Sequence, residues 1–180
     1  MRSNKLTYRK EIVKAMQYLA GMSNALFLGQ SICFPGHAMF STLEDANVPM
    51  DKRLELPVFE DTQMGISIGL ALGGFLPISI YPRMDFLIIA MNQLVNHLDR
   101  MEEMSHRRFQ PKVIIRTMVG SKKPLDAGPQ HTNDYTEALD SMLTTVSVIK
   151  LTTAENILPV YREAARSTRS SIIVEMADLY

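Results

Sequence analysis

Residues 56–78 constrain the fold most, because they predict a strand, a helix and a second strand in immediate succession. An acidic residue, Glu60, lies at the junction between the first strand and the helix. Gly65, Gly69 and Gly73 repeat every four residues and therefore share one helix face. A glycine inside a helix costs about 0.5–1 kcal/mol relative to alanine. Three on one face predict that another backbone approaches closely, although an ordinary βαβ unit with a tightly packed helix also explains the stretch.

The rest of the chain alternates short apolar runs with helical segments. Further strands are expected at residues 25–28, 77–81, 112–117, 145–150 and 171–175, and a short extended run is expected to end at Phe59. Further helices are expected from a Thr7 cap to about Ala20, from Asp85 to near His106, over 135–142, and from a Thr152–Glu155 capping box to about Arg166. Residues 29–47 and 119–134 are expected to be loops at the rim of a site.

Continuous apolar strands that alternate with helices are typical of a parallel sheet covered on both faces. Right-handed crossovers between such strands give a doubly wound arrangement. The sequence therefore predicts an α/β fold with a mostly parallel sheet and helices on both faces. With 180 residues, a single domain is expected.

Composition narrows the class of function. Nineteen basic and nineteen acidic residues are scattered along the chain, so no basic stripe predicts nucleic-acid binding. No stretch reaches the roughly 20 apolar residues of a membrane span, and no signal peptide is visible. The single cysteine, Cys33, excludes an internal disulfide framework and favours a reducing compartment, here the cytoplasm. Without CxxC or HExxH spacing, no metal site is expected.

The side chains that follow the predicted strands suggest a ligand site. No GxGxxG follows a strand, and GxxxxGK[ST] and GxSxG are missing, so dinucleotide, P-loop and hydrolase interpretations lack their motifs. In a parallel sheet, ligands gather at the carboxyl ends of strands. Gln30, Glu60, Tyr81 with nearby Phe86, and the loop that holds His131 are expected there. This set suits a flat, neutral or cationic heteroaromatic better than a phosphate. Phe86 also fits an ordinary core residue, and His131 a solvated loop histidine.

These residues resemble a known family. The chain is similar, from near residue 6 to residue 175, to the pyrimidine-binding domain of thiamine diphosphate enzymes of the transketolase and 2-oxoacid dehydrogenase E1 β-subunit type. The most specific similarity is a glutamate followed by spaced glycines over Glu60–Gly69, and then Gly74-Phe75-x-Pro77-Ile78. A second similarity is the histidine loop Ala127–His131, and residues 51–57 and 92–93 add support.

The resemblance implies a role for several residues. Glu60 would hydrogen-bond N1′ of the cofactor's aminopyrimidine ring and take part in catalysis. Val58 would line the slot for that ring, and Phe86 would stack on it. His131 would lie near the reacting carbonyl and assist proton transfer or hold the substrate. The glycine face of the helix after Glu60 would be a close contact between subunits.

The departures from the family imply a partner chain. The Gly-Asp-Gly…Asn motif that holds Mg²⁺ and the diphosphate is missing, so residues 1–180 are interpreted as one pyrimidine-binding domain, with no diphosphate-binding domain and no transketolase C-terminal domain. A diphosphate-binding subunit would supply the rest of the thiamine diphosphate and Mg²⁺ site in a two-fold hetero-oligomer. The substrate would be a ketose, for two-carbon transfer, or a 2-oxoacid, for decarboxylation and acyl transfer. The alternatives are a non-catalytic interaction or regulatory module, or an unrelated small α/β binding domain.

Departures within the motifs bear on the substrate. Gln30 stands where E1 β-subunits usually have an acidic residue, and Ile89 stands where a polar residue is usual. Residues 81–84, Tyr-Pro-Arg-Met, replace a more aromatic stretch. These differences bear on the identity of the substrate and not on the binding of the cofactor.

Overall fold

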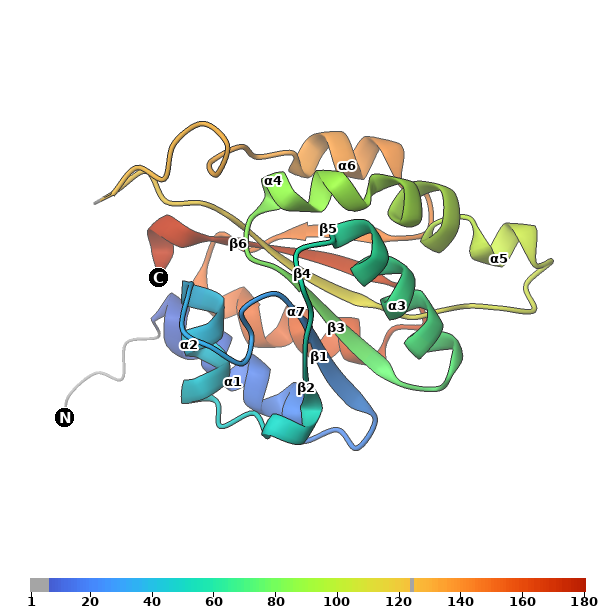
Figure 1. The fold of residues 1–180 in the computed structure, drawn as a ribbon, viewed down its shortest axis with the longest axis horizontal. Coiled ribbons are helices and arrows are strands. Elements are labelled where there is room, and N and C mark those ends of the chain that lie inside the picture. The colour runs from blue at the N-terminus through green and yellow to red at the C-terminus, as the bar shows by residue number, and fades with distance from the viewer. Residues whose placement is uncertain (1–6, 124) are drawn as a thin grey trace.

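A six-stranded sheet forms the centre of the computed structural model, which describes residues 7–123 and 125–180 (Figure 1). All neighbouring strands are parallel, in the order β2-β1-β3-β4-β6-β5. The strands are β1 (Ala25–Gly29), β2 (Arg53–Glu55), β3 (Leu76–Tyr81), β4 (Ile114–Val119), β5 (Ser147–Lys150) and β6 (Ser171–Met176). Phe27 of β1 lies opposite Arg53 on one side and Ile78 on the other. The predicted α/β fold is confirmed.

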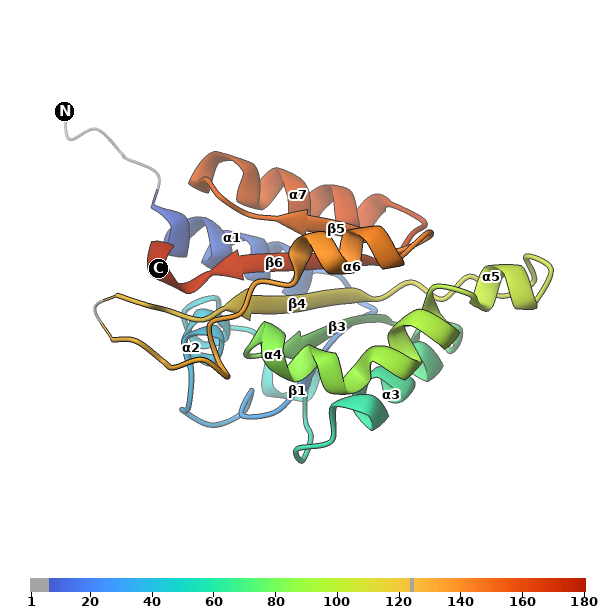
Figure 2. The same ribbon diagram turned by 90° about the horizontal axis from the view of Figure 1, so that it is seen from above.

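Helices cover both faces of the sheet (Figure 2). One face carries α1 (Tyr8–Ala20), α2 (Ala38–Asp45) and α7 (Ala154–Arg166). The other carries α3 (Glu60–Leu72), α4 (Met84–Leu87) and α6 (Thr136–Met142), and the chain continues from α4 towards α5 (Met101–Met104). Three short 3₁₀ turns are Met50–Lys52, Ile88–Ala90 and Ala177–Leu179, and Asn92–Leu98 is a π-helical segment.

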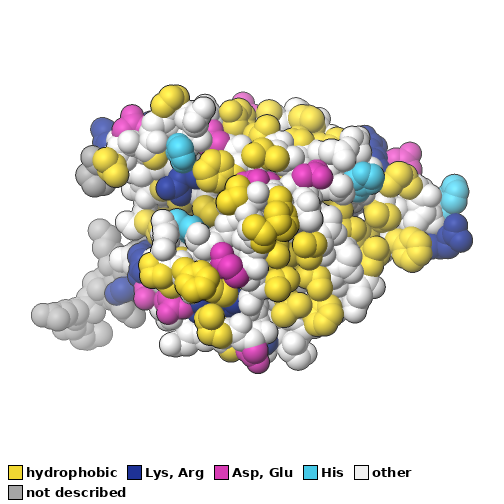
Figure 3. Space-filling model, in the orientation of Figure 1, with side chains coloured by type: hydrophobic (Ala, Val, Ile, Leu, Met, Phe, Trp, Pro, Cys, Tyr) yellow, Lys and Arg dark blue, Asp and Glu magenta, His cyan; other side chains and the backbone are white. Residues whose placement is uncertain are grey.

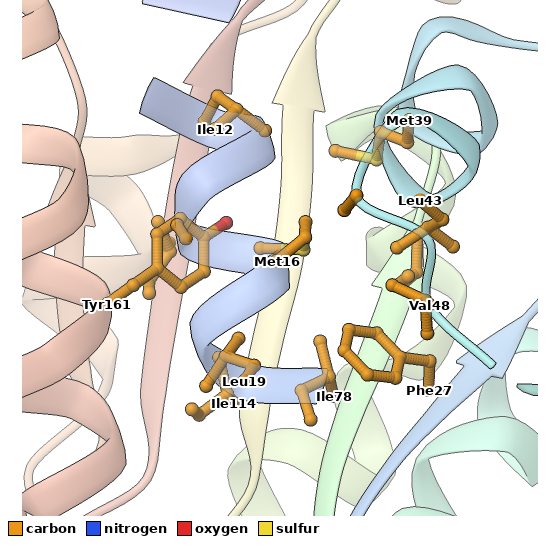
Figure 4. Close-up of a cluster of buried hydrophobic side chains, with 14 of the residues drawn as sticks. Ile12, Met16, Leu19, Phe27, Met39, Leu43, Val48, Ile78, Ile114 and Tyr161 are labelled. Atoms are coloured by element: carbon orange, nitrogen blue, oxygen red, sulfur yellow. The ribbon is translucent and has the colours of Figure 1, made fainter. Parts of the chain in front are cut away.

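Each face of the sheet has its own hydrophobic core. In the first core, the helix stripe Ile12, Met16 and Leu19 packs against strand residues such as Phe27 and Ile78 (Figure 4). The second core lies between the sheet and the layer of α3, α4 and α6. Successive strand residues point to opposite faces, so Ile114 joins the first core and Ile115 the second.

The strand order places a topological switch point between β1 and β3. From β1 the chain crosses through α2 to β2 at the edge of the sheet, and it returns through α3 to β3 on the other side of β1. Because α2 and α3 cover opposite faces, a crevice forms outside the carboxyl ends of β1 and β3. Residues that follow these two strands therefore lie at the position where doubly wound folds bind ligands.

Several local predictions are wrong or incomplete. Residues 29–47 are not all loop, because they contain α2, which buries Met39 and Leu43. The helix begins after His37, and the Nδ1 atom of His37 accepts the Phe40 N–H. The helix expected from Asp85 is divided into the short α, 3₁₀ and π segments given above. The capping box is also absent, since α7 begins at Ala154 and no side chain caps it. Thr7 precedes α1 but makes no capping hydrogen bond either.

Candidate active site

Glu60 is the first residue of α3, and its side chain is buried at the carboxyl edge of the sheet. Gln30, directly after β1, donates its side-chain N–H to Glu60 Oε1 at 2.9 Å. The hydroxyl of Tyr81, the last residue of β3, donates to the Glu60 backbone carbonyl at 3.3 Å. Within the described residues, no hydrogen bond reaches Oε2. The carboxylate is thus held by one oxygen and keeps the other available as an acceptor.

A cavity of about 240 Å³ opens beside Gln30 at the switch point. It is lined by Gln30, Ser31, Gly36, His37, Pro82, Arg83, Phe86 and His131. The lining comes from the turns after β1 and β3, from the start of α4 and from the loop after β4. The structure therefore brings Phe86 and His131 into one cavity and connects it to Glu60 through the Gln30 amide.

Phe86 and His131 are in direct contact, with ring centroids 5.5 Å apart and an edge-to-face angle of 81°. Gly120 makes this position of the histidine loop possible. A Cβ atom at position 120 would lie 1.9 Å from the His131 carbonyl oxygen, so a larger residue would push the loop away. The His131 backbone N–H donates to the Gly128 carbonyl at 3.0 Å, which closes the glycine-proline turn.

His37 lies at the rim of the cavity in a fixed, neutral form. Its Nδ1 accepts the Phe40 N–H at 3.2 Å, so Nε2 carries the proton and donates to the Gln30 carbonyl at 3.1 Å. Burial lowers the pKa of His37, and the Arg116 and Arg83 charges act in the same direction, whereas the bond to Gln30 opposes them. His37 therefore positions the turn that carries Gln30 and keeps no free nitrogen for a ligand.

Val58 lies apart from the cavity, on the exposed turn between β2 and α3, where 75% of its surface is accessible. It is part of an apolar surface on the face that carries α3 (Figure 3). This surface comprises Val58, Phe59, Leu72, Phe75, Ile88 and Ile89. A Cβ atom at Gly69 would meet no described atom within 4 Å. The close neighbour predicted for the glycine face is therefore not found at Gly69 among the described residues, whereas a Cβ atom at Gly65 would lie 3.9 Å from the Gln93 side chain.

Other sequence expectations concern metals and membranes. The described residues contain no group of three or more His, Cys, Asp or Glu side chains arranged to hold a metal ion. Over residues 7–123 and 125–180, no helix combines the length and the apolar character needed to cross a bilayer. Sequence reasoning missed His37 and Gly120, whose roles depend on contacts with residues that are distant in the chain. It noted Arg83 only as a departure from a more aromatic stretch.

The structure defines a doubly wound domain with a cavity at its switch point, and comparisons show which known proteins it resembles. No protein-family model matches the chain. It is 28% identical over 159 residues to the pyruvate dehydrogenase E1 component subunit beta of Gracilaria tenuistipitata var. liui, covering 88% of this chain and 48% of that protein. The corresponding subunit of Cyanidium caldarium is 26% identical over 163 residues, with the same shares covered. The chain thus spans about half the length of these curated relatives.

A solved structure described as a split gene transketolase, an inactive β4 tetramer, has the same fold. It aligns with a TM-score of 0.71 and 17% identity over 94% of this chain and 50% of that one. Together with the E1 β relatives, this similarity confirms the predicted resemblance to the pyrimidine-binding domain of the transketolase and E1 β type.

Proposed function

We propose that this chain is the pyrimidine-binding subunit of a split thiamine diphosphate-dependent enzyme. The observation that carries the proposal is Glu60, a buried carboxylate held at Oε1 by Gln30 and unbonded at Oε2 within the described residues. Such a group can accept a hydrogen bond from a protonated ring nitrogen or exchange a proton with it. The residues therefore fit the aminopyrimidine half of the cofactor.

The side chains around Glu60 would have different roles in binding and catalysis. Gln30 and Tyr81 fix the position of Glu60, so that its free oxygen is preorganised to hold a proton at ring N1′. The face of Phe86 would support the ring, and the imidazole of His131 would hold or transfer a proton at the substrate carbonyl. When bound, the cofactor supplies the electron sink for breaking a bond next to that carbonyl. Val58, which lies outside the cavity on the exposed β2–α3 turn, would line the part of the ring slot that this chain leaves open.

A partner chain would complete the site with the diphosphate and Mg²⁺ ligands. Two features support a partner: the apolar surface around α3 and the similarity of the fold to a split gene transketolase. An exposed apolar surface of this kind often marks a protein interface. Two-fold pairing of the two chain types would place each cofactor between subunits. The reaction would be ketol transfer or 2-oxoacid decarboxylation with acyl transfer, and a cytoplasmic location stays a prediction.

The test is cofactor binding and turnover in a complex reconstituted with the diphosphate-binding chain. Glu60→Gln should lower turnover about 10²–10⁴-fold, the usual contribution of a positioned acid–base group. Asp61→Asn is the matched control, because Asp61 is the neighbouring acid in the same helix turn and should leave turnover near the wild-type value. Unchanged turnover of Glu60→Gln would refute the role of Glu60.

The second candidate is a non-catalytic interaction module, which the apolar surface alone would also explain. The two functions differ in one measurement. A stable complex that never binds thiamine diphosphate, as seen by calorimetry, would favour the interaction module. Cofactor binding that requires both chains and is weakened by Phe86→Ala would favour the enzyme.

A further inference from the structure

The cavity at the switch point contains a guanidinium that no described carboxylate pairs with. Arg83 is half-buried, and no Asp or Glu oxygen of the described residues lies within the 4.0 Å that defines an ion pair. Its Nη1 donates to the Pro82 carbonyl at 2.7 Å and lies 3.8 Å from Met118 Sδ. Its Nε is buried without a partner. A buried N–H without a partner is unfavourable, and an anion bound beside Arg83 would satisfy it.

The nearest acidic influence on Arg83 is Asp85, whose Oδ1 is bonded elsewhere and whose Oδ2 is buried without a partner and outside ion-pair distance of Arg83. Burial lowers the pKa of Arg83, and the Asp85 charge partly offsets this. Asp85 Oδ1, however, accepts a hydrogen bond from Asn133, and Asp85 does not line the cavity. An arginine remains protonated despite such a shift. Arg83 therefore presents a positive charge to the cavity that Asp85 does not neutralise by direct contact.

The remaining walls of the cavity would accept an anion. Among the described residues, no acidic side chain lines it, and His37 is neutral with both nitrogens already bonded. Gln30 and Ser31 add polar groups at one side, while Phe86 and His131 form the other. An oxyanion would meet the Arg83 donors there without repulsion from a neighbouring carboxylate.

We propose that Arg83 binds the oxyanion of the substrate, next to Phe86 and His131, and so determines which substrates the enzyme accepts. A guanidinium fork matches the geometry of a carboxylate or a phosphate. The anion is the carboxylate of a 2-oxoacid or the phosphate of a phosphorylated ketose. The inference rests on the proposed function, because Phe86 and His131 are the residues assigned to the ring and the carbonyl.

Anion binding is tested first on the chain alone, by following the side-chain Nε–H of Arg83 with nuclear magnetic resonance. The probes are inorganic phosphate, pyruvate and neutral hydroxyacetone, at constant ionic strength. Phosphate, pyruvate or both should shift this resonance saturably, and hydroxyacetone should not. Arg83→Met should weaken anion binding, read from neighbouring amides, at least tenfold. The control Arg162→Met, which removes an arginine stacked 5.4 Å from the Tyr18 ring, should not.

Binding of pyruvate would indicate a 2-oxoacid substrate, and binding of phosphate would indicate a phosphorylated ketose. The variant Arg83→Lys provides a second test if Arg83→Met fails to fold. Lysine retains the charge without the fork and should bind more weakly than arginine. An Arg83 resonance that responds to no anion would overturn the inference and indicate pairing with Asp85 through solvent. Equal binding by wild type and Arg83→Met would overturn it as well.

The reconstituted complex then separates this inference from the proposed function. Arg83→Met should raise KM for the anionic substrate at least tenfold, change kcat less, and leave the Kd for thiamine diphosphate unchanged. If the complex binds no cofactor but Arg83 still binds anions, the proposed function fails and the anion site stands. If the cofactor binds and KM does not depend on Arg83, only the inference fails.

Discussion

Two arginines near the carboxyl edge of the sheet have opposite surroundings. Arg116 of β4 is fully buried and donates to both oxygens of Glu175, from Nε at 2.7 Å and from Nη2 at 3.0 Å. Three further side chains complete the cluster. Arg116 donates hydrogen bonds to the hydroxyls of Thr42 and Tyr180, and the Tyr161 hydroxyl donates to Glu175. Arg83, one strand away, is half-buried and unpaired within the described chain.

The difference shows how one sheet edge serves both stability and binding. Burial disfavours the Arg116 charge, but Glu175 more than compensates and raises the pKa of Arg116. The cluster uses nearly all its polar groups internally, with Arg116 Nη1 as the exception among its nitrogens. We call these five residues the closed cluster. The switch-point cavity instead leaves Arg83 Nε without a partner among the described residues, and the neighbouring Glu60 Oε2 accepts no hydrogen bond from them, as expected for a site that binds a ligand.

The largest expected effect is the loss of stability when the closed cluster is broken. Arg116→Met should lower the free energy of unfolding by about 3–5 kcal/mol, because it leaves the Glu175 carboxylate buried and unpaired. Urea unfolding measures the change. The matched control is Arg83→Met, which removes a charge with no ion-pair partner and should change stability by less than about 1 kcal/mol. Equal losses in both variants would remove the distinction between the two regions.

A smaller effect is expected at alkaline pH. Burial and the Glu175 charge raise the pKa of Tyr161 and Tyr180. Both stay protonated in the folded chain after they would ionise in the unfolded chain, so stability should fall as pH rises above about 10. The slope should rise through pH 10 and approach about 1.4 kcal/mol per pH unit for each of these tyrosines near pH 11. Urea unfolding at pH 9, 10 and 11 measures it, and an unchanged slope in Tyr161→Phe would contradict this account.

The smallest expected effect concerns the glycine face of α3. Gly69→Ala should stabilise the isolated chain by about 0.5–1 kcal/mol, because no described atom would contact the new methyl group. The same variant should weaken binding of the partner chain, measured by calorimetry. Gly74→Ala is the contrasting control, since Gly74 has φ +89° and alanine there should destabilise the chain. Unchanged partner binding by Gly69→Ala would place the interface elsewhere.

Much of the fold followed from the sequence because its signals are local. Continuous apolar runs predicted β1, β3, β4, β5 and β6, whereas β2 is Arg53–Glu55 and not the extended run expected to end at Phe59. Glu60 with the glycines after it predicted the limits of α3 closely. The helix α2 escaped prediction because its start depends on His37, whose neutral ring bonds backbone groups at Gln30 and Phe40. The divided helix after β3 followed from packing that no local pattern in residues 84–104 indicates.

The sequence by itself determined the alternation of strands and helices, the acid at the start of α3 and the resemblance to a pyrimidine-binding domain. Only the tertiary structure decided which polar groups meet. It brought Gln30 to Glu60 and placed His131 against Phe86. It also gave Arg116 a carboxylate partner, whereas Arg83 has none among the described residues. The physical reason is that periodicity fixes the face and element of a side chain. Strand order and loop packing fix its neighbours, and those neighbours decide whether a buried charge stabilises the fold or remains free for a ligand.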